Sequence, residues 1–163
     1  MLFNADLNFV SRVSTALIIT SFLGACGDSS QFSEGITFNR DGYPGFVSSV
    51  KGISGKEGFG RWTDGTQAVI EFTQPLPKNF TLKIKAAPFA PSMGKPIKIV
   101  VGTAQLETKF SKPEPTEVVI PVATDGNARS IIFELPDAKS PKELGLSGDS
   151  RRLSLALVSL KIK

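Results

Sequence analysis

The sequence predicts an all-β fold, and more specifically a β-sandwich of the jelly-roll type. Short runs that alternate apolar and polar residues recur along the chain, glycine and proline separate them, and no periodic stretch reaches helical length. The 163 residues, of which 40% are hydrophobic, suffice for one domain with a real core. About eight strands are expected from this spacing.

The strands are predicted from their alternation, which gives each run one apolar and one polar face. In 67–73, Ala68, Ile70 and Phe72 form the apolar face, and in 80–86 the polar face carries Lys83 and Lys85. Three further runs repeat the pattern: 96–102, 116–122 and 129–135. The last run, 152–163, is apolar on both faces over its first half, which is typical of a central strand.

Loops are predicted where prolines remove the N–H donors that a ladder needs. This applies to 73–79 and to 87–96. The stretch "SPKELG" predicts one helical turn, with Ser140 as the N-cap, Pro141 at the first position and Gly145 ending it.

The N-terminal segment has the pattern of an export signal. Arg12 is followed by thirteen uncharged residues, too few to span a bilayer as a helix, and "LGAC" ends at Cys26. This pattern resembles bacterial lipoprotein signal peptides, and the resemblance implies that residues 1–25 are removed and that Cys26 is lipidated. An ordinary cleaved signal with an incidental cysteine is the alternative.

The same resemblance implies the location of the protein in the cell. We expect a tether over 26–34, rich in small polar residues, and the folded domain over 35–163. The lipid would anchor the chain to a membrane on its periplasmic side. Because Gly27 separates Cys26 from Asp28, the pattern of inner-membrane retention is not met, and we expect the outer membrane.

Composition argues against an enzyme. The chain has no histidine and one cysteine, which excludes serine–histidine triads, zinc sites built from those residues, and disulfides. Glu57 and Asp64 could be suggested as a glycosidase pair, but with 15 acidic residues some pair is always available. We therefore expect no catalytic residue, no metal and no cofactor.

The net charge of +4 comes from lysines and arginines that are spread along the chain without a dense block. This distribution favours a solvated surface with some attraction for anionic lipids or glycans, and gives no support to nucleic-acid binding.

A second resemblance covers about residues 45–163. The order of motifs is similar to that of a C-terminal accessory domain of unknown function found on membrane phosphoglycerol transferases and some bacterial sugar transferases. The positions that carry it are Gly52, Glu57, Gly60, Arg61, Trp62, Asp64, Leu76, Pro77, Gly94, Lys95, Pro96, Gly102, Ser140, Pro141, Leu144, Gly145, Asp149, Arg151 and Leu153. The chain departs from the pattern at Ser92, where an asparagine is expected, and at Ser154, where a glycine is expected.

That resemblance implies a module that accompanies envelope glycan-modifying machinery, and the predicted jelly roll is of the galactose-binding-like kind. The transferases use a histidine-containing metal site that this chain cannot build, so their activity is not carried over. We expect a non-catalytic envelope module that binds a glycan or associates with a glycan-modifying protein. A purely structural protein–protein scaffold is the alternative.

The candidate ligand-binding residues lie in two stretches: Glu57, Arg61, Trp62 and Asp64 in the first, and Asp149 and Arg151 in the second. In one interpretation Trp62 offers its ring to a sugar and the charged groups bind hydroxyls. In the other, which we favour, Trp62 fills one end of the core, Arg61 pairs with a carboxylate, and Asp149 with Arg151 braces the loop before the last strand. Arg152 is expected to be solvated.

Overall fold

The computed structural model describes residues 29–163, so the signal segment and Cys26 lie outside the described residues. Its strands are β1 (Ile36–Thr37), β2 (Val47–Lys51), β3 (Arg61–Asp64), β4 (Gln67–Phe72), β5 (Asn79–Pro88), β6 (Ile97–Val101), β7 (Ala104–Thr108), β8 (Thr116–Ala123), β9 (Ser130–Glu134) and β10 (Leu153–Ile162). Two short 3₁₀ helices are η1 (Ser29–Phe32) and η2 (Ala90–Ser92). In this part of the chain no helix is long and apolar enough to cross a membrane.

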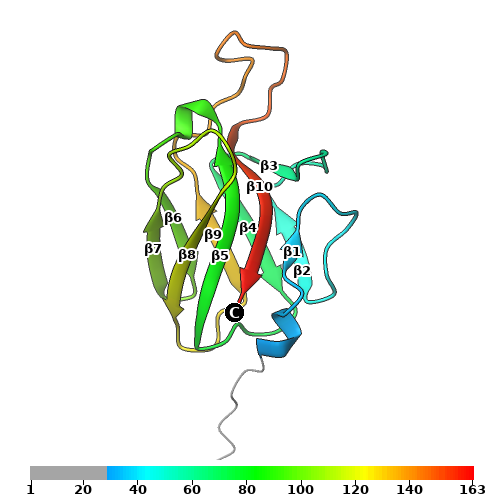
Figure 1. The fold of residues 1–163 in the computed structure, drawn as a ribbon, viewed down its shortest axis with the longest axis vertical. Coiled ribbons are helices and arrows are strands. Elements are labelled where there is room, and N and C mark those ends of the chain that lie inside the picture. The colour runs from blue at the N-terminus through cyan, green and yellow to red at the C-terminus, as the bar shows by residue number, and fades with distance from the viewer. Residues whose placement is uncertain (1–28) are drawn as a thin grey trace, which may run out of the picture.

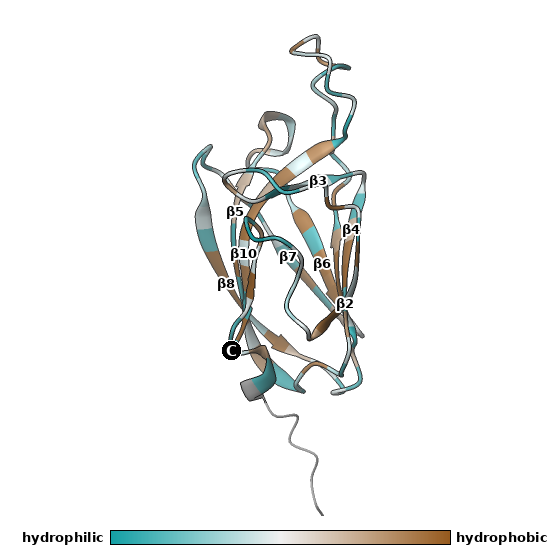
Figure 2. Ribbon diagram, turned by 90° about the vertical axis from the view of Figure 1, so that its right-hand side faces the viewer, coloured by the Kyte–Doolittle hydropathy of each residue, from teal (hydrophilic) through white to brown (hydrophobic). Residues whose placement is uncertain are grey.

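The strands form two antiparallel sheets that pack face to face (Figures 1 and 2). Sheet A has the order β1-β10-β5-β8, with β3 also paired to β10, and sheet B has the order β2-β4-β9-β6-β7. From β2 to β6 the chain changes sheet at every step, and it does so again from β7 to β10. The fold is the predicted all-β jelly-roll sandwich.

The predicted strands that show full alternation are confirmed as β4, β5, β6, β8 and β9, and the last run is β10, which is central in sheet A. The prediction did not name β1, β2, β3 and β7. These strands have two to five residues and are mostly half-exposed, so they lack the length over which alternation becomes visible. Their pairing partners, rather than their own sequence, make them strands.

The core lies between the sheets and is built from the inward faces of the alternating strands. Ile70, Leu82, Ile84, Phe133 and Leu157 are fully buried in it. These are the faces that the alternation predicted, since successive side chains in a strand point to opposite sides.

The packed domain begins earlier than the expected start at Gly35. Phe32, at the end of η1, is 1% exposed and belongs to the core. Its ring meets Phe46 and Phe72 edge-on, with centroid separations of 5.4 and 5.8 Å. Part of the stretch that we expected to be a tether is therefore fixed to one end of the sandwich.

The expected turn at Ser140 is present and closed at both ends. The Ser140 hydroxyl accepts the N–H of Glu143 at 3.0 Å, and the Glu143 carboxylate accepts the N–H of Ser140 at 3.3 Å, which makes a capping box. Gly145 ends the turn at φ +70°, a conformation that glycine adopts without a Cβ penalty. The turn lies in the loop that projects beyond the sandwich in Figure 1.

Candidate functional site

Glycine allows the stretch before β3 to lie directly against the sheets. A Cβ on Gly60 would collide with the carbonyl oxygen of Leu157 on β10, and a Cβ on Gly52 would collide with the carbonyl oxygen of Gln67. The loop between these glycines is thus held close to β10 at one end and to β4 at the other. This close approach sets the position of Trp62, two residues after Gly60.

Trp62 lies on the outer face of sheet A. Trp62 on β3 lies opposite Ala156 on β10, and Ala156 lies opposite Ala87 on β5, so the three residues form one row across the sheet. The neighbouring Thr63 is fully buried, so the alternation of β3 turns Trp62 outward. The indole is half-buried and stands outside the core cluster. The prediction that Trp62 fills one end of the core is therefore wrong, because the short strand turns its small Thr63 inward instead.

Two phenylalanines flank the indole on this face. Phe59 meets it edge-on at 5.6 Å between ring centroids, and Phe89, which directly follows β5, does so at 6.0 Å. Edge-to-face pairs of this kind fix ring orientation and add stability beyond their buried area. Neither phenylalanine was predicted as a site residue, although each is an aromatic residue in a glycine- or proline-rich loop, and this signal could have identified them.

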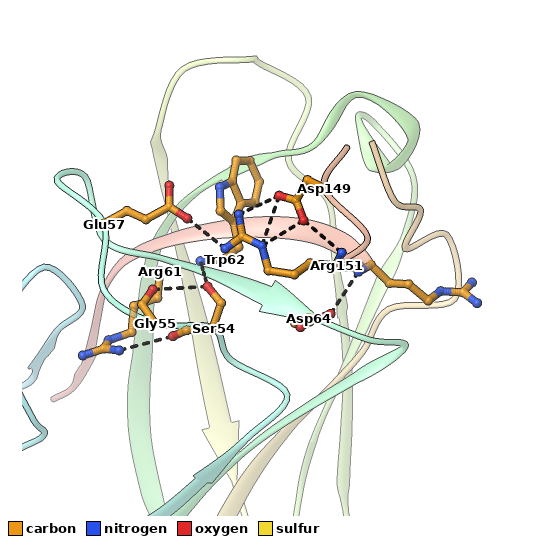
Figure 3. A network of polar contacts seen from close by, with 9 residues as sticks. Ser54, Gly55, Glu57, Arg61, Trp62, Asp64, Asp149 and Arg151 are labelled. Carbon is orange, nitrogen blue, oxygen red and sulfur yellow. Dashed lines mark hydrogen bonds and ion pairs between the residues drawn. The ribbon is translucent and has the colours of Figure 1, made fainter. Parts of the chain in front are cut away.

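Arg151 organises the charged residues beside β3 (Figure 3). Its guanidinium donates to both carboxylate oxygens of Asp149, at 2.7 to 3.1 Å, and to Glu57 at 2.9 Å. These hydrogen bonds hold the pKa of Asp149 below its ordinary value, and together with the contact to Glu57 they raise the pKa of Arg151. The predicted Asp149–Arg151 brace is confirmed, and it ties the loop before β10 to the loop before β3.

Arg61 and Asp64 have other partners than those we expected. Arg61 donates to the carbonyl oxygens of Ser54 and Arg40, both at 3.2 Å, and its guanidinium lies 5.1 Å above the centre of the Tyr43 ring. The prediction that it pairs with a carboxylate is therefore wrong, since Arg151 takes Glu57 and Asp149. Asp64 accepts the backbone N–H of Arg152 at 2.9 Å. Arg152 is exposed, as expected, and also donates to the carbonyl of Ala138 at 2.9 Å.

Of the six candidates, four thus form one region on the outer side of sheet A: Trp62 on β3, and Glu57, Asp149 and Arg151 in the loops beside it. Arg61 and Asp64 support the backbone around them. Such a region can stack on an apolar ring face and donate or accept hydrogen bonds around it. Within residues 29–163, no three of the side chains that bind metals gather into a potential metal site.

A family model described as "Domain of unknown function (DUF7024)" matches residues 27–163. The chain belongs to the DUF7024 family. The match covers all ten strands and both glycine-rich and Asp–Arg stretches of the region around Trp62.

Curated relatives of this DUF7024 chain are much longer proteins. It is 32% identical over 134 residues to a phosphoglycerol transferase I of Citrobacter koseri, an alignment that covers 80% of this chain and 17% of the relative. It is 29% identical over 158 residues to a phosphoglycerol transferase I of Escherichia coli (strain SE11), covering 94% and 20%. The chain therefore spans about a fifth of the length of these relatives and resembles an accessory domain of them.

Among solved structures, the DUF7024 domain is similar in fold to family 29 carbohydrate-binding modules. A CBM29-2 mutant complexed with mannohexaose superposes with a TM-score of 0.53 at 13% identity, covering 78% of this chain and 89% of that one. A second CBM29-2 mutant, complexed with cellulohexaose, has a TM-score of 0.52 at 13% identity, covering 78% and 88%. At this identity the likeness concerns the fold.

Proposed function

We propose that this DUF7024 protein is a non-catalytic, glycan-binding module of the bacterial cell envelope. The observation that carries the proposal is the position of Trp62, outside the core and flanked by Phe59 and Phe89. Filling a core cannot explain an aromatic cluster that stands on the outer face of a sheet. A ring held in this way can stack on the apolar face of a sugar.

Polar groups beside the ring would complete a sugar site. Asp149 and Glu57 fix the Arg151 guanidinium, and their carboxylate oxygens keep lone pairs that can accept hydrogen bonds from sugar hydroxyls. The two family 29 modules of similar fold are complexed with mannohexaose and with cellulohexaose, which supports a linear oligosaccharide as the class of ligand.

The relatives supply the setting for the proposal. They are named for transferring phosphoglycerol, and this chain resembles only one part of them, so we place it beside such machinery as a module that holds the glycan. The lipid anchor at Cys26 and the periplasmic side of the outer membrane belong to the same proposal. Since η1 packs at one end of the sandwich and Trp62 lies toward the other end of β10, an anchored domain would turn its site away from the membrane.

Calorimetric titration of the full chain with cellohexaose and with mannohexaose tests the proposal. We expect saturable binding that Trp62→Ala abolishes. The matched control is Val69→Ala, which removes a half-buried side chain from the outer face of sheet B. Binding that survives Trp62→Ala, or hydrolysis of either sugar, would contradict the proposal.

A scaffold role is the second candidate, and a different surface favours it. Leu144 and Leu146, in the projecting loop, are 42% and 67% exposed. Exposed leucines close together are typical of a contact with another protein. Co-purification of a stoichiometric envelope partner that is lost in Leu144→Ser/Leu146→Ser, together with no sugar binding, would favour the scaffold.

A further inference from the structure

Strand pairing gathers three lysines on the outer face of sheet A. Lys83 and Lys85 alternate with the buried Leu82 and Ile84 on β5, so both point outward. Lys161 follows Leu160 on β10, which is buried, and it lies directly opposite Lys83. Lys161 is 76 positions from Lys85 and 78 from Lys83 in the sequence, so the fold brings it close to them.

This cluster has little internal compensation. Among the described residues, one carboxylate lies against the three lysines: Glu117 on β8, which is directly opposite Lys85 and whose oxygen is 4.0 Å from Lys83 Nζ. On the outer face of sheet B, by contrast, Lys51 pairs with Glu71 at 3.2 Å and Lys98 pairs with Glu134 at 3.1 Å. Lysines on the outer face of sheet B are therefore paired one to one with carboxylates, whereas the three on sheet A share one carboxylate at a longer distance.

Stability does not explain the lysines of sheet A. Like charges directly opposite each other on neighbouring strands destabilise a sheet, and Lys83 and Lys161 are such a pair. Lys85 and Lys161 are also exposed to solvent rather than shielded by a loop. In Figure 1 the strands β8, β5 and β10 lie in front of sheet B.

The lysines continue the surface that carries Trp62. Along β5, Ala87 is level with Trp62, with Ala156 of β10 between them, and it is followed on the same face by Lys85 and then by Lys83. At about 3.3 Å per residue, the distance from Ala87 to Lys83 along β5 is roughly 13 Å. Ala87 and Ala156 have small side chains, so no large side chain of these two positions stands between the indole and the lysines. A register shift in β10 between Leu157 and Ser159 lies at this junction, as bulges often do beside sites.

Resting on the proposed glycan binding, we infer that the ligand is an acidic glycan that lies along the outer face of sheet A. One sugar ring stacks at Trp62, and phosphate or carboxylate substituents further along the chain are held by Lys83, Lys85 and Lys161. The aromatic group and the cations occupy one continuous surface, and this favours a glycan over an anionic membrane, for which the ring and the two alanines of its row would have no use.

Two probes that differ only in charge test the inference: cellohexaose and cellohexaose phosphorylated at O6. The full chain is titrated with each in low salt. We expect the phosphorylated probe to bind on the order of tenfold more tightly, the combined effect of three exposed charges, and we expect added salt to remove that gain. The variant Lys83→Gln/Lys85→Gln/Lys161→Gln should bind both probes within about twofold of each other.

The matched control is Lys51→Gln/Lys98→Gln/Lys109→Gln, which removes the same net charge from sheet B and the residue after its strand β7, and should keep the tenfold preference. Equal binding of both probes by the unmodified chain would overturn the inference and leave the proposed function standing. Failure of both probes to bind would overturn both. Binding to vesicles of anionic phospholipid that depends on the same lysines, without a preference for the phosphorylated probe, would identify a membrane surface instead and overturn the inference.

Discussion

The hydroxyl of Ser154 donates a hydrogen bond to the hydroxyl of Ser92 at 2.9 Å, and both side chains are buried. These are the two positions at which the sequence departs from the pattern of the domain that it resembles, where an asparagine and a glycine are expected. Because the two residues touch, we expect the departures to compensate each other, with a shorter side chain on η2 matched by a longer one on β10. The pair also lies beside the site, since the N–H of Phe89 donates to the carbonyl of Ser154 at 2.7 Å.

A double-mutant cycle tests whether the two departures compensate. Ser92→Asn alone puts extra atoms into the buried space that Ser154 fills, and should cost about 1–3 kcal/mol in the free energy of unfolding. Ser154→Gly alone should cost about 1 kcal/mol through lost contacts and backbone entropy. In the double variant the costs should be less than additive by about 0.5–3 kcal/mol, as read from urea unfolding. Strict additivity would show that the positions are independent.

Gly60→Ala should destabilise the domain by roughly 1–3 kcal/mol, because a Cβ there would meet the backbone of Leu157 and the loop would have to move off β10. Thermal unfolding measures the cost. Gly58→Ala is the matched control, since a Cβ at Gly58 meets nothing within 4 Å, and it should change little. Equal effects of the two substitutions would contradict the close approach that places Trp62.

The contribution of the Asp149–Arg151 brace should depend on pH. Hydrogen bonds from Arg151 lower the pKa of Asp149 in the folded state, so the stabilisation is present above the ordinary carboxyl pKa and is lost as the pH falls through the lower, folded value. Asp149→Asn should therefore be less stable than the unmodified chain at pH 7, and the gap should narrow below about pH 4.

Urea unfolding between pH 7 and pH 2.5 measures this gap, with Glu114→Gln in the exposed loop after β7 as a control that keeps the same change in charge. A gap for Asp149→Asn that stays constant over that range would show that the carboxylate charge does not stabilise the brace.

The sequence predicted the parts of the fold that local pattern determines. The alternation in 67–73 and 80–86 identified β4, β5 and their buried faces, and the double apolar face of β10 identified its central place. It did not predict the four-residue β3, and an error about Trp62 followed, because which way Trp62 points depends on the pairing of β3 with β10. A residue on such a short strand has no periodicity of its own to orient it.

The charged residues show the same division. The Asp149–Arg151 contact joins residues two apart, so spacing was enough to predict it. The contact of Arg151 with Glu57 crosses 94 positions and depends on the pairing of β3 with β10, which brings the loops before these strands together. The approach of Lys83 and Lys161 crosses 78 positions and depends on the register of β5 with β10. Lysines that looked evenly spread along the sequence are concentrated by pairing.

Lipidation of Cys26 is the prediction that concerns the segment before the described residues. Cells grown with an alkyne-labelled fatty acid should incorporate label into the unmodified protein, because "LGAC" follows an uncharged run of the length typical of an export signal. Cys26→Ser should lose the label. Equal labelling of the two proteins would show that the cysteine is not the anchor.

Acrylamide quenching of fluorescence reports on ligand stacking at Trp62 without interference, because Trp62 is the single tryptophan of the chain. A half-buried indole on the outer face of sheet A should be quenched at an intermediate rate, and a stacked sugar should shield it. We expect saturating phosphorylated cellohexaose to lower the quenching constant, in step with binding measured by calorimetry. A quenching constant that stays the same while the sugar binds would place the ligand elsewhere and show that Trp62 is not its stacking platform.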